Sequence, residues 1–167
     1  MSDNPFWDYS LVFYSQPKVA KCCLEYQDQH EANVNILLMC CWLGSLGVLI
    51  NSHELEQANL TINSIDLHAV QPLRAVRQFI KTLKPPEEEL YHNVQQVELM
   101  AEQVVQNELF NWSIRNDLIT DKKFIGKKKV ISSEVALAAQ MKNLNTYLSL
   151  LGCSSVSINS PLCNGHD

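Results

Sequence analysis

Apolar residues along this chain recur mainly every three or four positions, which is the spacing of amphipathic α-helices. β-branched runs are short and glycine is scarce, with 5 in 167 residues, so the pattern favours helices over a sandwich or barrel. It predicts helices over about residues 5–15, 17–30, 52–59 and 132–152, one starting near Asn33, and two on either side of Pro85 and Pro86.

The third predicted helix is apolar nearly all round, which is typical of a helix surrounded by others. Its near-apolar run, 36–50, is short for a membrane span, which needs about 20 residues. Asn33 suits its N-cap. The small residues Cys40, Gly44 and Gly47 share one strip, where we expect another helix to approach closely.

Two further apolar stripes flank the double proline. The first runs from Ile62 to Leu83 and contains Pro72, so the helix either kinks there or a new helix starts there. The second runs from Leu90 to about Phe110, and together they predict an antiparallel helical hairpin.

These elements predict an all-α fold, a single compact helical bundle of five to seven helices around a buried central helix. A leucine-rich stripe in the last helix is expected to pack on the same chain or on another subunit, and an exposed stripe would give a homodimer through this C-terminal helix. We expect four segments: a helical domain over 1–110, a basic connecting loop over 111–131, a C-terminal amphipathic helix over 132–152 packed on or beside the domain, and a disordered tail over 153–167.

Composition adds two constraints. The net charge of −5 argues against a DNA-coating protein but permits a local basic patch. The six cysteines include no C-x-x-C pair, and the N-terminus has no basic and apolar signal-peptide pattern. We therefore expect reduced core cysteines, no membrane span and a cytoplasmic location.

The N-terminal half carries a specific signature, FWDYSLVFYSQPKVAKCCLEYQDQHEANVNILLMCCWLG. It resembles the opening of a proteobacterial family known as a conserved domain of unknown function, in the residues Phe6, Trp7, Ser10, Leu11, Tyr14, Pro17, Val19, Leu24, Gln27, Asp28, Val34, Asn35, Leu37, Leu38 and Trp42. The segments 72–77 and 98–102 are also similar, and the resemblance covers about residues 5–110. At Asn33 the family more often carries Asp.

What this resemblance implies is a small cytoplasmic helical protein of bacteria. It also implies a protein partner that is translation-related, since the family's genes often lie near one for an ABC-type ATPase of the translation-factor kind. The resemblance brings no catalytic residues with it.

Polar residues cluster where the third helix begins. One interpretation is a small polar pocket for a ligand, formed by Gln27, Asp28, Asn35 and Trp42. The other is an ordinary loop in which Asn33 caps the helix and its neighbours bond free backbone groups. Asn35 is the hardest to explain as a cap, because a buried amide needs a partner.

Basic residues form two candidate surfaces for an anionic partner such as RNA. Arg74, Arg77, Lys81 and Lys84 share one helix face, and they either pair with glutamates along the hairpin seam or contact phosphates. The second surface is a lysine loop formed by Lys122, Lys123, Lys127, Lys128 and Lys129, which is otherwise a solvated loop.

Catalytic motifs are missing from the sequence. It has no nucleophile elbow, phosphate-binding glycine loop or metal-protease helix, and Glu89 with His92 forms a single E-x-x-H where di-iron bundles need two. We expect no cofactor and no metal, and favour a non-enzymatic interaction or regulatory protein. RNA- or ribosome-associated binding and a small-molecule or enzymatic pocket are the alternatives.

Overall fold

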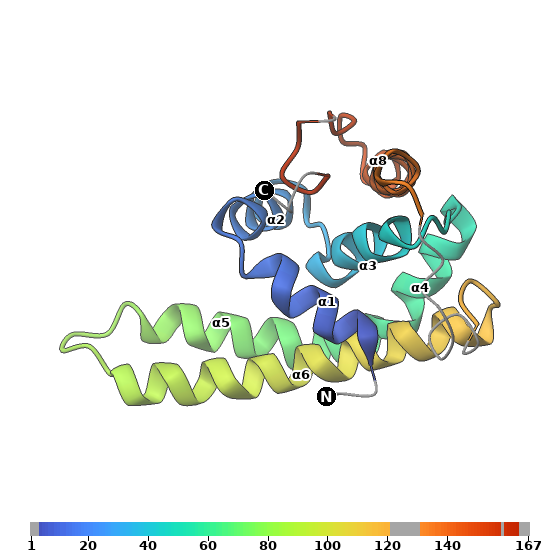
Figure 1. Ribbon diagram of the computed structural model, residues 1–167. Helices are drawn as coiled ribbons and strands as arrows, with labels where there is room; N and C mark the ends of the chain where they lie inside the picture. The colour runs from blue at the N-terminus through green and yellow to red at the C-terminus, as the bar shows by residue number, and fades with distance from the viewer. Residues whose placement is uncertain (1–3, 121–130, 158, 164–167) are drawn as a thin grey trace.

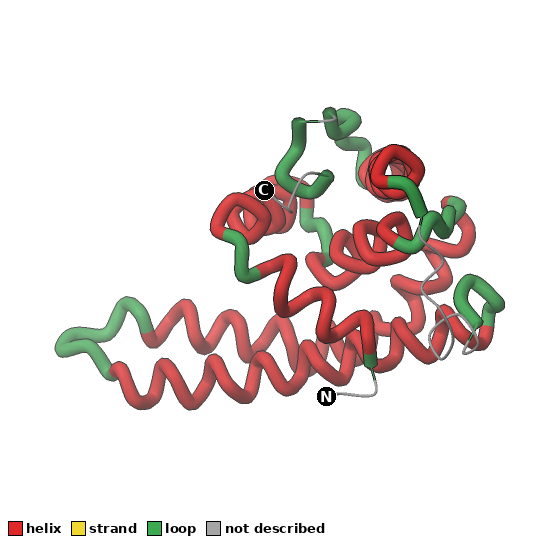
Figure 2. Tube along the Cα trace, in the orientation of Figure 1, coloured by secondary structure: helices red, strands yellow, loops and turns green. Residues whose placement is uncertain are grey.

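The computed structural model describes residues 4–120, 131–157 and 159–163. Its helices are joined by loops, and no described residue forms a strand (Figures 1 and 2). In chain order the helices are α1 (Pro5–Tyr14), α2 (Pro17–His30), α3 (Val34–Ser45), α4 (Ser52–Ile65), the π-helical segment η1 (Asp66–Val70), α5 (Gln71–Ile80), α6 (Glu88–Arg115) and α8 (Ser133–Leu150). The predicted all-α bundle is confirmed.

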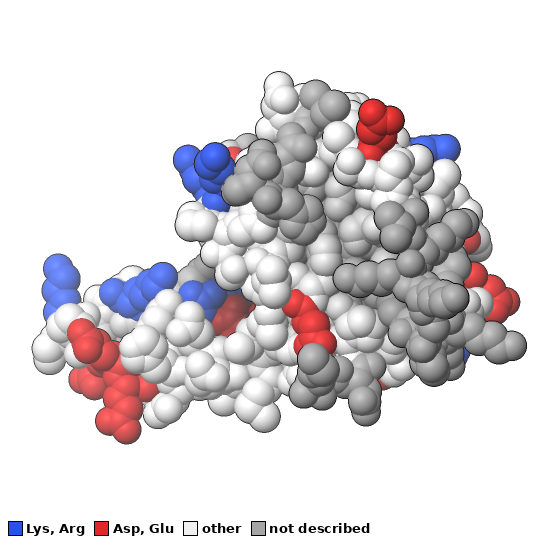
Figure 3. Space-filling view, in the orientation of Figure 1, with Lys and Arg blue, Asp and Glu red and all other residues white. Residues whose placement is uncertain are grey.

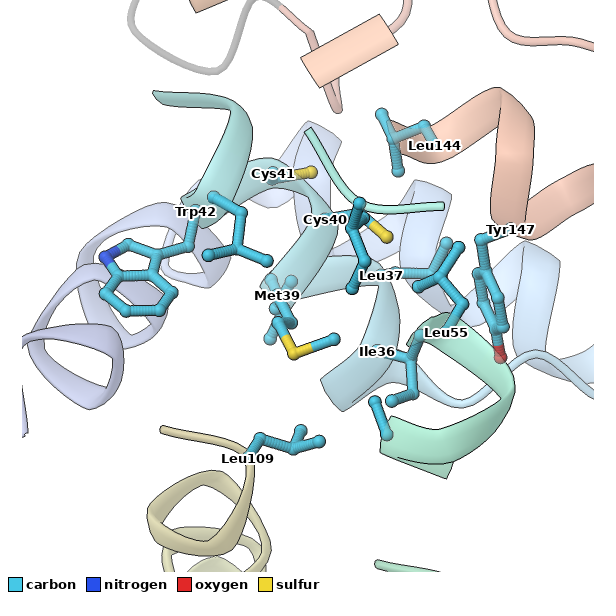
Figure 4. Close-up of a cluster of buried hydrophobic side chains, with 14 of the residues drawn as sticks. Ile36, Leu37, Met39, Cys40, Cys41, Trp42, Leu55, Leu109, Leu144 and Tyr147 are labelled. Atoms are coloured by element: carbon cyan, nitrogen blue, oxygen red, sulfur yellow. The ribbon is translucent and has the colours of Figure 1, made fainter. Parts of the chain in front are cut away.

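Helix α3 lies at the centre of the fold, with α1, α2, α4, α6 and α8 packed around it. Every residue from Asn35 to Gly44 is buried. Figure 4 shows side chains of α3 in one cluster with Leu55 of α4, Leu109 of α6 and Tyr147 of α8. Each fully buried aliphatic side chain contributes about 1.5–3 kcal/mol, so this helix is the main source of apolar stabilisation. The buried central helix is confirmed.

Asparagine or serine side chains cap four of the described helices, including α4, where Asn51 forms a capping box with Glu54. The Asn33 side chain accepts a hydrogen bond of 2.9 Å from the backbone N–H of Asn35 and so caps α3, as predicted. Asn4 caps α1 and Ser132 caps α8 in the same way. Each such cap satisfies a backbone donor that the helix leaves free, which is worth about 1 kcal/mol.

Helix α8 crosses α3 at Gly44, within the predicted strip of small residues. A Cβ atom on Gly44 would lie 2.5 Å from the Cα atom of Gln140. The Gln140 side chain donates to the carbonyl of Cys41 at 3.2 Å, and that of Asn143 donates to the carbonyl of Val48 at 2.9 Å. The two helices are therefore in backbone contact and joined by buried amides.

The leucine stripe of α8 packs on the same chain. Leu144 and Leu148 are fully buried in the core, and Leu137, Met141 and Leu151 are half-buried against it. The stripe is covered by α3 and its neighbours, and a homodimer through this helix stays a prediction.

One continuous helical path runs through α4, η1 and α5, longer than the short helix expected over residues 52–59. The π-helical segment ends at Val70, two residues before Pro72, and the backbone N–H of Gln71 bonds to the carbonyl of Asp66, five residues earlier. A proline in an α-helix collides with the carbonyl four residues before it, and a π turn widens the helix there. Pro72 thus causes a local change of register.

Helices α5 and α6 form the predicted antiparallel hairpin, whose far end projects beyond the rest of the molecule (Figure 1). Helix α6 continues past Phe110 to Arg115, because Leu109, Trp112 and Ser113 extend its buried stripe. The expected loop over residues 111–131 therefore begins later, and residues 121–130 lie outside the described part.

Part of the segment expected to be a disordered tail packs on the core. Val156, Leu162 and Cys163 are buried. The Cys41 thiol donates to the carbonyl of Leu162 at 3.4 Å, and the side-chain oxygen of Asn145 accepts from the backbone N–H of Val156 at 2.7 Å. A few apolar residues in a Ser- and Asn-rich segment thus suffice to anchor it.

Membrane insertion has no candidate helix in this fold. None of the helices in the described residues combines the length and the apolar character that crossing a bilayer requires.

Candidate functional site

A cleft of about 700 Å³ lies between the α5–α6 hairpin and the helices α1, α2 and α3, and we call it the hairpin cleft. Its lining includes three residues of the predicted polar pocket and three of the predicted basic face, namely Gln27, Asp28, Asn35, Arg74, Arg77 and Lys81. Two candidate surfaces that the sequence placed separately are therefore parts of one concavity.

Trp42 is a core residue rather than part of this cleft. Its ring stacks on Phe6, with ring centroids 5.1 Å apart, and lies 6.0 Å from the ring of Phe110. Asn35 and Trp42 are two turns apart on α3, or about 10 Å along its axis. By that point α1 and α6 have closed over the helix, so the assignment of Trp42 to the polar pocket is corrected.

An arginine–glutamate network forms the hairpin side of the cleft. Arg77 donates through Nε and Nη2 to both carboxylate oxygens of Glu98, the second at 3.1 Å. Arg74 reaches Glu98 at 3.4 Å and Glu102 at 3.2 Å. Glu98 is only 5% exposed. The structure thus shows the pairing along the seam, and these two arginines are largely neutralised as ligands for RNA phosphate.

The second carboxylate of the network is less favourably placed. Burial raises the pKa of Glu102, and the charge of Arg74 offsets this only in part. The hydrogen bonds that Arg77 donates to Glu98 raise the pKa of Arg77, against the opposing effect of its burial. The Arg77–Glu98 pair is therefore the fixed centre of the network, and the Glu102 carboxylate is held less strongly at its edge.

Two buried amides form the inner wall of the cleft. Gln106 of α6 donates through Nε2 to the side-chain oxygen of Asn35 at 2.8 Å, and the two residues are 2% and 3% exposed. Asn35 thus has the partner that its buried position required. Among the described residues, however, no donor reaches Oε1 of Gln106, and Ser10 Oγ, on the same cleft wall, is also unpartnered. Buried polar atoms without a partner are rare and costly.

The remaining polar residues of the predicted pocket lie at the rim of the hairpin cleft. Gln27 is half-buried and Asp28 is exposed. With Glu98 and Glu102, Asp28 balances the three cations of the lining, Arg74, Arg77 and Lys81. The cleft therefore offers both donors and acceptors without a net formal charge.

Lys84, the remaining described residue of the predicted basic surfaces, does not line the cleft and is exposed in the loop at the hairpin tip. Lys81, which does line the cleft, places its ammonium 5.3 Å from the ring centre of Tyr91. The lysine loop, Lys122, Lys123, Lys127, Lys128 and Lys129, lies outside the described residues.

Sequence reasoning did not select Glu98, Glu102 and Gln106 as site residues. They stand at positions i, i+4 and i+8 of α6, which places three polar side chains on one face of that helix. This polar stripe, paired with the Arg74–Arg77 face of the adjacent helix, was the signal that could have identified them.

Nucleophilic and metal chemistry have little support here. Burial raises the pKa of Cys22, and that of Cys23 to about 12, so these thiols are protonated at neutral pH. The described residues contain no cluster of three or more His, Cys, Asp or Glu side chains that could hold a metal ion. Glu89 and His92 are both exposed near the start of α6.

Comparison with known proteins assigns this architecture to one family. The sequence model of DUF2390, described as a protein of unknown function, matches residues 5–109. This span coincides with the region of resemblance found in the sequence and includes the hairpin cleft. No curated protein and no solved structure matches the chain.

Proposed function

The chain belongs to the DUF2390 family, whose function is unknown, and we infer its role from its own geometry. We propose that it is a non-enzymatic regulatory protein that binds a small polar molecule in the hairpin cleft. The main support is Gln106, which is 2% exposed and whose Oε1 accepts no hydrogen bond within the described part of the chain. A ligand N–H or O–H that reached this oxygen would remove the cost of burying it unpaired.

The dimensions and charge of the cleft indicate the class of ligand. Its volume of about 700 Å³ falls in the range of small-molecule sites, roughly 300–1,000 Å³. Its three cations are matched by three carboxylates. We therefore expect an uncharged or zwitterionic molecule rather than a polyanion, with a donor for Gln106 and an acceptor for the guanidinium groups.

Binding is favoured over catalysis because the charged groups of the cleft are committed to one another. Glu98 accepts hydrogen bonds from two arginines and so is a poor general base. RNA binding, a translation-related protein partner and a cytoplasmic location stay predictions that await a test. Of these, the RNA interpretation is weakened most, since Arg74 and Arg77, two of the four cations of its first candidate surface, are paired.

A ligand screen on the full chain tests this proposal. Thermal unfolding would be followed with amino acids, small amides, nucleosides and neutral sugars, each at about 1 mM. A ligand at 100 times its Kd stabilises the protein by about 2.7 kcal/mol. We expect at least one uncharged or zwitterionic compound to raise the Tm.

Matched variants then locate the site. Gln106→Leu should abolish the ligand-induced rise in Tm, while Gln57→Leu, at an exposed position of α4, should keep it. Gln95→Arg, which blocks the cleft from an exposed position, should act like Gln106→Leu without altering the core. Equal ligand affinity in all three variants, or no response to any compound, would refute the proposal.

A further inference from the structure

The hairpin carries a second surface, on the side away from the cleft. Six large apolar side chains on α5 and α6 are each between 47% and 66% exposed, namely Val76, Phe79, Leu90, Val97, Met100 and Val104. None of them lines the hairpin cleft. We call this set the apolar hairpin face.

Helix geometry places these residues together, opposite the network. On α5, Val76 and Phe79 each come two positions after an arginine of the network. On α6, Met100 and Val104 each come two positions after a glutamate of the network. Two residues correspond to about 200° around an α-helix, which is nearly the opposite side. Leu90 and Val97 are spaced by seven from each other and from Val104, so they extend the same stripe.

The size of this face is that of a large apolar patch. The 15 residues of α6 from Leu90 to Val104, at 1.5 Å each, give a length of about 22 Å, and two adjacent helices give a width of about 20 Å. The resulting footprint is on the order of 450 Å², within the range of the largest apolar patches on monomers, which are often functional. Two copies joined through it would bury about 900 Å², which is the size of a weak, transient interface.

Charges at the hairpin tip select the arrangement. Lys84 lies in the loop at the hairpin tip, and Glu87, Glu88 and Glu89 lie at the start of α6. Figure 3 shows basic groups along α5 and an acidic group at the start of α6 at the projecting end. No ion pair between described residues uses any of these four. A two-fold axis parallel to the hairpin brings α5 of one copy against α6 of the other with both tips at the same end, so the lysine of each copy faces the glutamates of the other.

From the exposed face and the self-complementary tip, we propose that two copies of this chain associate through their apolar hairpin faces in a symmetric four-helix arrangement. Such an interface closes on itself and leaves both clefts accessible on the outside. The proposal does not depend on the ligand-binding function, because the two surfaces use opposite sides of the hairpin.

Sedimentation equilibrium of the full chain, over about 1–200 µM in low salt, gives the first test. We expect a monomer–dimer equilibrium. Phe79→Glu with Met100→Glu should raise the dissociation constant at least 10-fold while circular dichroism stays unchanged. Leu60→Glu is the matched control, since Leu60 is 65% exposed on α4, and it should leave the dissociation constant as it is. A monomer throughout this range, or an equal effect of the control, would overturn the proposal.

A charge exchange tests the arrangement. One variant carries Lys84→Glu, and the other carries Glu87→Lys, Glu88→Lys and Glu89→Lys. Each alone should dimerise at least 10-fold more weakly, whereas their mixture should form heterodimers at least as tightly as the native chain. A dissociation constant that these substitutions leave unchanged would reject the parallel arrangement. Restored pairing in the mixture would establish it, because tips at opposite ends could not interact.

Discussion

Helix α3 and the α5–α6 hairpin solve the same packing problem in opposite ways. Helix α3 has five neighbouring helices and buries every residue from Asn35 to Gly44. In the projecting part of the hairpin, α5 and α6 pack mainly on each other. A charged network links the two helices on the cleft side, while apolar side chains are exposed on the other side. The chain thus separates a region that provides stability from one whose surfaces are free for binding.

This difference teaches where stability resides. Apolar burial in α3 contributes about 25 cal/mol per Å². A partly exposed ion pair contributes only about 0–1 kcal/mol, and more when one partner is buried. We therefore expect the hairpin to open more readily than the core, as binding regions generally do.

The largest expected effect lies in the core. Gly44→Leu would force a side chain against the Gln140 backbone, which lies 2.5 Å from the position of a Cβ. Because backbone cannot move aside cheaply, we expect a loss of at least about 3 kcal/mol in the free energy of unfolding. Urea denaturation measures it, with the exposed Ser149→Ala of α8 as a control that should change stability by less than about 0.5 kcal/mol. A loss no larger than that of the control would contradict the backbone contact.

A smaller effect is expected in the hairpin. Glu98→Gln removes the buried charge that holds Arg74 and Arg77, whose side chains are each 19% exposed. The arginines can partly turn to water, so we expect a loss of about 1–2 kcal/mol, below the cost of breaking a fully buried pair. Glu108→Gln, in a 4.0 Å pair with Arg115 at the surface, should cost less than about 0.5 kcal/mol. Hydrogen exchange should show faster opening in α5 and not in α3; equal acceleration in both would mean that the two regions unfold as one unit.

The smallest effect concerns pH. The pKa of Glu102 is raised in the folded protein, mainly by burial, so the folded state binds its proton more readily than the unfolded state does. Its contribution therefore favours folding below the unfolded pKa of 4.5 and is lost as the pH rises through the raised folded pKa. Comparing the native chain with Glu102→Gln, the native chain should gain relative stability as the pH falls from 7 to 4.5. A difference that is constant with pH would show that this carboxylate is not perturbed.

The local features of the fold were predictable from the sequence. Asn4, Asn33 and Ser132 mark helix starts because a cap depends on a few adjacent residues. The hairpin and its arginine–glutamate pairing follow from two adjacent stripes joined by a short loop. In both cases the interacting groups are close in sequence or fixed by one turn.

The features that the sequence did not reveal depend on distant segments. The bond between Asn35 and Gln106 joins residues that are 71 positions apart, and no local pattern indicates that pairing. Trp42 has the same helical phase as Asn35, yet its surroundings are set by α1 and α6. The burial of Leu162 likewise depends on a contact with Cys41, which its Ser- and Asn-rich context does not suggest.

The packing of α8 on α3 means that α3 is synthesised well before the helix that covers it. Helix α3 ends at Ser45 and α8 begins at Ser133, so 88 further residues (133 − 45) are added before translation even reaches its main covering helix. At about 5–20 residues per second, this takes roughly 4–18 s. During that interval the Gly44 side of α3 is not yet covered by α8. We therefore expect the nascent chain to expose apolar surface of the kind that chaperones bind until α8 has been made.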